Sequence, residues 1–248
     1  MSCRSPCSTR CWKERGRVAS SRARAFAAQL SELERRIVDE LERAAVLLAD
    51  TADAIHAPVA DKVQEIVDES TRLRQAGRSI DAELVIVAAR QAPVASDLRL
   101  VLALIEVAHH SVLIANQFDL ISEQLTTFEP AAVDRSKTAP ILAATAHLAG
   151  SQLLHAVSAF ASRDLARALR IDVEDDEIDK LNGEVFEAAL ALEEQREPAR
   201  RHVLVARSIE RIADNAVDIA EQAAFVLTGD RSEFTDASLP RRRTLQQP

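Results

Sequence analysis

Apolar residues recur every three or four positions along most of the chain, which is the period of one face of an α-helix. In the first such segment, near residues 26–55, this stripe is made of Leu30, Leu33, Ile37, Leu41, Ala44, Leu48, Ala52 and Ile55. Comparable patterns follow near residues 58–92, 96–125, 140–162, 163–195 and 199–228. The sequence therefore predicts six long helices.

The residues that break helices stand between these segments rather than inside them. Proline occurs at positions 58, 93, 130, 140 and 198, and Gly229 follows the last apolar stripe, where a left-handed cap is expected. Short connections between long helices make consecutive helices antiparallel neighbours. We predict an all-α fold of two tandem three-helix bundles, the first over residues 25–132 and the second over residues 133–230.

Composition agrees with helices and excludes some classes of function. Of the 248 residues 47% are hydrophobic, with no Tyr and one Trp, so Ala, Leu, Val and Ile dominate, which disfavours a sheet protein. The formal charge is −8, and because residues 1–24 carry a net +6, residues 25–248 carry −14. An acidic body argues against nucleic-acid binding, and the lack of an unbroken apolar run of about 18 residues argues against a membrane span.

The two ends of the chain are predicted to be disordered tails. Residues 1–24 are basic, lack an apolar face and hold all three cysteines, Cys3, Cys7 and Cys11, so this segment is either a disordered tail or an over-extended start. Three thiols at this spacing can in principle bind a metal, but cysteines confined to a tail are more typical of a protein of the reducing cytosol. Residues 231–248 form the second tail.

The last helix combines an apolar stripe with an acidic ridge. Val205, Ile209, Ile212, Ala216, Ile219 and Ala223 share one side, and Glu210, Asp214, Asp218 and Glu221 share the other. A solvated helix face explains the ridge without any bound ion, because Arg207 and Arg211 precede two of these acids by three residues and can form surface ion pairs. The pattern alone leaves both interpretations open.

Two motifs in this chain resemble those of the PhoU family of phosphate-uptake regulators. The stretch Gln91-Ala-Pro-Val-Ala-Ser-Asp-Leu-Arg99 is similar to the family's first motif, and Glu210-Arg-Ile-Ala-Asp214 with its continuation to Glu221 is similar to the second. The resemblance implies a non-catalytic, cytoplasmic regulator that dampens signalling from a phosphate ABC transporter to a sensor histidine kinase. It implies that the protein reaches the inner membrane only through these partners, and a homodimer is an open alternative.

The same resemblance implies metal binding. In the family, the Glu-x-x-x-Asp motif of the third helix in each repeat binds metal together with acids from the preceding helix. In the second repeat the motif is Glu210 and Asp214, and the preceding helix supplies Asp175 and Asp179. Carboxylate ligands favour a hard or borderline divalent ion, so Mg, Mn, Fe or Zn is the expected cofactor.

The first repeat departs from this pattern. With an offset of 99 residues between the two third helices, Ser111 stands where the second repeat has Glu210 and Ala115 where it has Asp214. On the helix before, Ser70 and Arg74 replace the acidic pair. The alignment therefore predicts that the first repeat has lost its metal site.

The loss of these charges suggests a contact surface. Ala108, Ser111, Val112 and Ala115 would form an uncharged patch on the third helix. Because large uncharged patches are rarely left exposed, we expect this face to pack against another chain or an added segment.

Two further hypotheses compete with a regulator of phosphate signalling. A related regulator that serves another transporter or kinase is the nearer one. The other is a di-iron helical enzyme, suggested by Glu106-Val-Ala-His109, although such sites need a second Glu-x-x-His motif, which the sequence lacks. Neither a Gly-rich phosphate loop nor a Gly-x-Ser-x-Gly turn occurs, and His110 falls on a core stripe, where a buried, hydrogen-bonded histidine is expected.

Overall fold

The computed structural model describes residues 9–56, 58–127, 138–190 and 196–231, and these residues form helices and no strand. The helices are α1 (Thr9–His56), α2 (Ala60–Gln91), α3 (Ala95–Leu125), α5 (Thr138–Ser162), α6 (Leu165–Ala168), α7 (Ile171–Leu190) and α8 (Arg196–Thr228). The predicted all-α class is confirmed. All six long helices of the prediction are present, and the short α6 is an addition.

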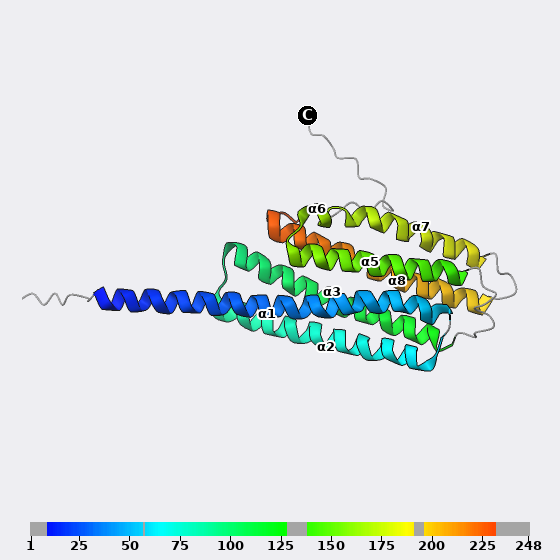
Figure 1. Cartoon of the computed structure of the whole chain (residues 1–248), viewed down its shortest axis with the longest axis horizontal. Coiled ribbons are helices and arrows are strands. Elements are labelled where there is room, and N and C mark those ends of the chain that lie inside the picture. The colour runs from blue at the N-terminus through cyan, green and yellow to red at the C-terminus, as the bar shows by residue number, and fades with distance from the viewer. Residues whose placement is uncertain (1–8, 57, 128–137, 191–195, 232–248) are drawn as a thin grey trace, which may run out of the picture.

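The long helices form two bundles that lie side by side (Figure 1). Helices α1, α2 and α3 make the first, and α5, α7 and α8 make the second. Contacts of α1 with α5 and of α3 with α8 join the two, which leaves α2 and α7 on the outside. The predicted pair of three-helix bundles is therefore correct, and each third helix lies next to the other.

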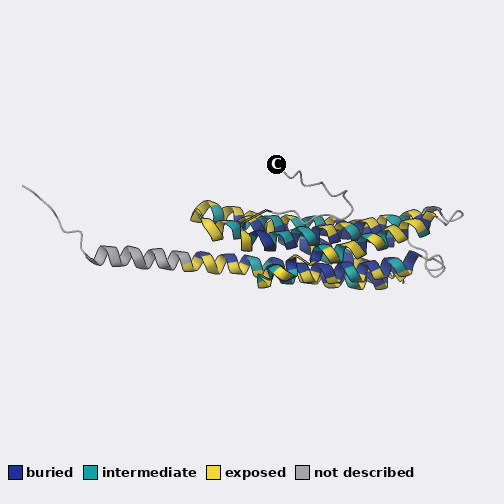
Figure 2. Cartoon of the chain, turned by 90° about the horizontal axis from the view of Figure 1, so that it is seen from above, coloured by how far each residue is buried: buried dark blue, intermediate teal, exposed yellow. Residues whose placement is uncertain are grey.

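The core follows the apolar stripes of the sequence, and Figure 2 shows buried residues along the length of the bundle. On α1, Leu33, Ile37, Leu41 and Leu48 are each at most 1% exposed. Where α1 meets α5, a Cβ at Gly150 would lie 2.7 Å from the carbonyl oxygen of Ala45, so the two backbones approach as closely as glycine allows. Close packing of α1 against α5 holds the two bundles together along this side.

Helix α1 begins earlier than the sequence pattern predicts. Residues 9–24, expected to be disordered, are the start of α1, which runs past the ends of its neighbours in Figure 1. Residues 1–8 and 232–248, the remaining parts of the two predicted tails, lie outside the described residues. The pattern missed residues 9–24 because their sequence has no apolar residues repeated at helical spacing.

The connection between α2 and α3 uses the backbone in place of a side-chain cap. Ala92 and Ala95 both have positive φ, 46° and 50°, on either side of Pro93. Ala92 donates its N–H to the Ala88 carbonyl at 3.1 Å, which ends α2. The N-cap of α3 is Val94, and no side chain caps this end of the helix.

Two further helix ends are set by local chemistry. Gly229 has a φ of 83° and donates its N–H to the Phe225 carbonyl at 2.9 Å, which confirms the predicted left-handed stop. Between α5 and α6 the Asp164 side chain accepts a hydrogen bond from the Arg167 backbone N–H at 3.0 Å. This cap explains why a short helix stands where the pattern predicts one continuous segment.

Among the described residues, α3 is the one helix long and apolar enough to meet the composition of a membrane span, with a mean hydropathy of 1.7 in its most apolar window. Within the bundle 44% of that window is buried. Its contacts with α2 and α8 give it the place of a core helix, a class that meets the same test of composition.

Candidate functional site

The four acids expected to bind metal lie on the neighbouring helices α7 and α8. Glu210 and Asp214 are one turn apart on α8, and Asp175 and Asp179 are one turn apart on α7, which packs against α8. Partial burial, followed by the charges of Asp175, Glu210 and Asp179, raises the pKa of Asp214 to about 7, and nearby Arg207 opposes this change. The structure therefore places the carboxyl groups of Asp175, Asp179 and Glu210 within electrostatic reach of Asp214.

Neighbouring polar groups already bond some of these carboxylates. Asn182 on α7 donates to Oε2 of Glu210, and an Arg207 guanidinium nitrogen lies 2.5 Å from Oε1 of the same residue. Gln152 on α5 donates to Oδ1 of Asp175 at 2.8 Å. Within the described residues no group of three or more His, Cys, Asp or Glu side chains is placed to hold a metal ion as the side chains stand.

The chemistry of the cluster nevertheless fits a hard divalent cation. Its donors are carboxylate oxygens, and the raised pKa of Asp214 reflects negative charge that Arg207 compensates only in part. Asp214 is also exposed on its outer side, so an ion can reach it from solvent. Release of Glu210 by Asn182 and Arg207 would add its carboxylate to those of the Asp residues.

The structure corrects the register in which the two repeats were aligned. Val107, Ser111, Ile114, Phe118 and Ile121 on α3 are buried, and so are Val205, Ile209, Ile212, Ala216 and Ile219 on α8, each 98 residues later. An offset of 99 residues would instead pair some buried positions of α3 with partly exposed positions of α8. Glu210 therefore corresponds to Val112 and Asp214 to Asn116, one residue beyond Ser111 and Ala115.

On the preceding helices the sequence alignment was correct. Ile66, Leu73, Ile80 and Leu84 of α2 and Ile171, Ile178, Val185 and Ala189 of α7 are buried in the same order, 105 residues apart. Ser70 and Arg74 thus correspond to Asp175 and Asp179. With Val112 and Asn116 included, the first repeat has none of the four acids, as the sequence predicts.

The prediction that four residues of α3 form an exposed contact patch is wrong. Ala108, Ser111 and Ala115 are fully buried, and Val112 is partly exposed. Helix α2 covers them, because Gly77 brings its backbone so near that a Cβ there would lie 2.3 Å from Ser111 Oγ and 2.8 Å from the Ala108 carbonyl oxygen. An error of one residue in register moved the prediction from the outer face of α3 to the face that packs on α2.

The outer face of α3 is nonetheless apolar. Leu98, Leu102 and Leu120 are 37–45% exposed, and Val112 and Leu113 between them are partly exposed. The same positions of α8 hold charged residues, among them Glu210 and Arg211. The third helices of the two repeats therefore differ in charge, as the sequence indicated. The uncharged face of α3 lies one residue further along than the sequence alignment predicted.

Comparisons with known proteins agree with the two-repeat architecture. A family model described as "PhoU domain" matches residues 142–223, which span most of the second repeat. The phosphate-specific transport system accessory protein PhoU of Edwardsiella tarda is 30% identical over 189 residues, which cover 73% of this chain and 76% of that protein. The chain belongs to the PhoU family. A PhoU homolog of Rhizobium meliloti is 29% identical over 83% of this chain and 88% of its own length.

Solved PhoU structures have the same fold. The phosphate transport system regulatory protein PhoU of Streptococcus pneumoniae superposes with a TM-score of 0.75, covering 84% of this chain and 99% of its own, at 18% identity. PhoU of Pseudomonas aeruginosa gives 0.67 at 21% identity, covering 85% of this chain. The fold is thus shared over 99% of each of these two solved proteins and over 84–85% of this PhoU-family chain.

The di-iron alternative finds no support in the geometry of its motif. Glu106 is half-buried and His109 is exposed, so this pair does not point together into the interior of the PhoU-type bundle. His110 instead is largely buried, with Nδ1 2.8 Å from Oδ1 of Asn215 on α8, as expected for a satisfied core histidine.

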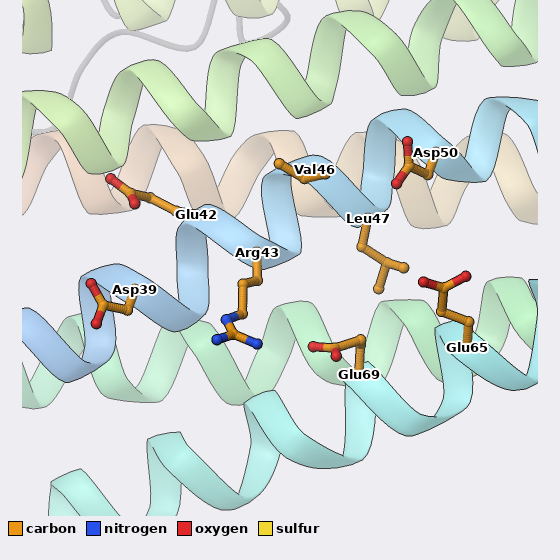
Figure 3. A pocket seen from close by; sticks show the side chains of 8 residues that line it. All are labelled: Asp39, Glu42, Arg43, Val46, Leu47, Asp50, Glu65 and Glu69. Carbon is orange, nitrogen blue, oxygen red and sulfur yellow. The ribbon is translucent and has the colours of Figure 1, made fainter.

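A groove of about 480 Å³ lies elsewhere, between α1 and α2 (Figure 3). Its walls carry Asp39, Glu42, Arg43, Val46, Leu47 and Asp50 from α1, with Glu65 and Glu69 from α2. In Figure 3 the Arg43 side chain points between the two helices toward the α2 carboxylates. None of the predicted metal ligands lines this groove, so the α7–α8 cluster remains the candidate site.

Proposed function

We propose that this PhoU-family protein is a non-catalytic regulator of phosphate transport that couples a phosphate ABC transporter to a sensor histidine kinase and dampens both uptake and starvation signalling. The observation that carries the proposal is similarity over 76–88% of the length of relatives named for phosphate-specific transport. An all-helical chain with two related bundles also offers long surfaces for partner proteins.

The place of action follows from the same proposal. The protein works in the cytoplasm and reaches the inner membrane through its partners. Its acidic body makes the negatively charged surface of a membrane an unfavourable direct partner. Contact with the transporter therefore requires a protein surface, and the apolar outer face of α3 beside the charged face of α8 is the surface on which we expect it.

A metal ion is the proposed ligand of the second repeat. Asp175, Asp179, Glu210 and Asp214 would hold Mg²⁺, Mn²⁺, iron or Zn²⁺ between α7 and α8. A bound divalent ion would supply the positive charge that this cluster lacks and would link the two helices. Gln152 would position Asp175 for the ion, and Glu210 would bind it once Asn182 and Arg207 release its two oxygens.

Binding to purified partners tests the proposal. The full chain, immobilised, is expected to retain the purified ATPase subunit of the phosphate transporter and the cytoplasmic part of the phosphate-sensing kinase. The ATPase subunit of an unrelated ABC transporter is the control. Retention of the control but of neither phosphate protein would instead support a regulator of another transport system.

A further inference from the structure

The first repeat carries a positive charge of its own at the position that corresponds to the acidic cluster. Arg74 on α2, the counterpart of Asp179, forms an ion pair with Asp119 on α3. Its side chain is 18% exposed, so the pair is largely enclosed between the two helices on the arginine side. The sequence did not predict this pair. Asp119 corresponds to Val217 in the second repeat, a position outside the acidic motif.

Every group that Arg74 contacts presents an oxygen. Its Nε lies 3.3 Å from Oδ1 of Asn116, and a terminal nitrogen lies 3.4 Å from the Ala115 carbonyl oxygen and close to Oδ2 of Asp119. Ser70 donates its hydroxyl to the other Asp119 oxygen at 2.6 Å. One carboxylate, one amide oxygen and one carbonyl oxygen form the type of donor set that hard divalent cations bind.

We propose that Arg74 occupies a cation site between α2 and α3, so that the guanidinium of the chain itself holds the first repeat together. The contrast with the second repeat rests on the metal ion proposed for Asp175, Asp179, Glu210 and Asp214. The two repeats then differ in what holds their second and third helices together. The α2–α3 contact is permanent and insensitive to metal, and the α7–α8 contact changes with the supply of divalent ions. Any response to metal is then confined to the second of the two bundles.

Charge and size both support this assignment. Removal of the guanidinium would leave the Asp119 carboxylate beside the Asn116 and Ala115 oxygens without a positive partner, which is unfavourable in a half-buried place. A small hydrated cation can fill the space of the lost side chain and bind the same oxygens. The proposal therefore makes a claim that a purely structural salt bridge does not: a metal ion can replace the arginine.

The experiment uses the full chain with Glu210→Ala and Asp214→Ala as background, so that Mn²⁺ cannot act through the second repeat. Arg74→Ala, Arg74→Gln and Arg74→Lys are each added, and the melting temperature is measured with and without Mn²⁺. Arg78→Ala, an exposed arginine one turn further along α2, is the matched control. Failure of the phosphate-transport proposal does not affect this measurement, because it involves no partner protein.

The proposal predicts that Arg74→Ala and Arg74→Gln lower the melting temperature by about 2–4 °C for each kcal/mol lost, with a smaller loss for Arg74→Lys because lysine keeps the charge. It predicts that Mn²⁺ raises the melting temperature of Arg74→Ala but not of the background or of Arg78→Ala. If Arg74→Ala does not fold without metal, folding on addition of Mn²⁺ would equally support the proposal. Equal losses for Lys and Gln, or no response of Arg74→Ala to Mn²⁺, would overturn it.

Discussion

His110 on α3 and Asn215 on α8 join the two repeats across the middle of the molecule, with 2.8 Å between Nδ1 and Oδ1. Because the amide oxygen can only accept, the imidazole donates from Nδ1. Asp218, one turn along α8, lies 3.5 Å from the same nitrogen. Burial raises the pKa of Asp218, Glu106 raises it further and His110 lowers it, so the histidine offsets part of the penalty for placing a carboxylate here.

Replacement of His110 should weaken the contact between the repeats. We expect His110→Leu to lower the free energy of unfolding by about 1–3 kcal/mol, because it leaves the buried Oδ1 of Asn215 without its donor. Urea denaturation followed by circular dichroism measures the change. His147→Leu, at an exposed histidine of α5, is the control and should change stability little. An equal effect of the two substitutions would show that the His110 contact contributes nothing.

Two glycines give a matched test of the close packing of α2 on α3. Gly77→Ala should destabilise the protein by about 1–3 kcal/mol, because the new methyl group would collide with Ser111 Oγ and with the Ala108 carbonyl oxygen of α3. Gly183→Ala on α7 meets no atom within 4 Å and should stabilise by about 0.5–1 kcal/mol through helix propensity. Thermal unfolding of both variants checks the opposite signs, and the same sign for both would refute this explanation.

The stability of the protein should fall in acid because of His202. Burial lowers the pKa of this histidine to about 4, from an unfolded value of 6.5. The unfolded chain therefore binds a proton first as the pH drops, so stability present above pH 6.5 is lost as the pH falls toward 4, by about 3 kcal/mol in total. Urea midpoints measured between pH 7 and 4 should fall less steeply for His202→Gln. Parallel pH profiles would contradict this role of His202.

Metal binding to the second repeat should be visible as thermal stabilisation. Mn²⁺ or Mg²⁺ is expected to raise the melting temperature of the parent, because a ligand that binds only the folded state stabilises it. Glu210→Ala with Asp214→Ala should abolish the rise. Glu184→Ala with Glu187→Ala, which removes two exposed acids of the neighbouring helix α7, should leave the rise intact. A parent protein without any metal-linked shift would end the metal hypothesis.

The fold was predictable because its elements carry strong local signals. The apolar stripe from Leu30 to Ile55 predicts a helix with one face in a core. Gly229 predicts a helix end, because glycine readily adopts the left-handed conformation. The start of α1 at Thr9 could not be predicted, since the sequence of residues 9–24 has no apolar stripe. The break between α5 and α7 depends on the Asp164 side chain, whose capping role is ambiguous without the surrounding backbone.

The candidate site was predictable in part. Glu210 and Asp214 are one turn apart on a regular helix, and their neighbours Asp175 and Asp179 follow from the resemblance to PhoU. The contact patch on α3 was misplaced because one residue of register rotates a helix by about 100° and so exchanges an outer face for a buried one. Arg74 and Asp119 were missed as a pair because they lie 45 residues apart and only packing brings them together.

Phosphate uptake in a strain that lacks this protein is the most direct test of its role as a regulator of phosphate transport. In phosphate-rich medium the strain should accumulate more radiolabelled phosphate than its parent, and expression of the full chain should restore the lower rate. Uptake equal to that of the parent, with or without the chain, would contradict the role in phosphate transport proposed above.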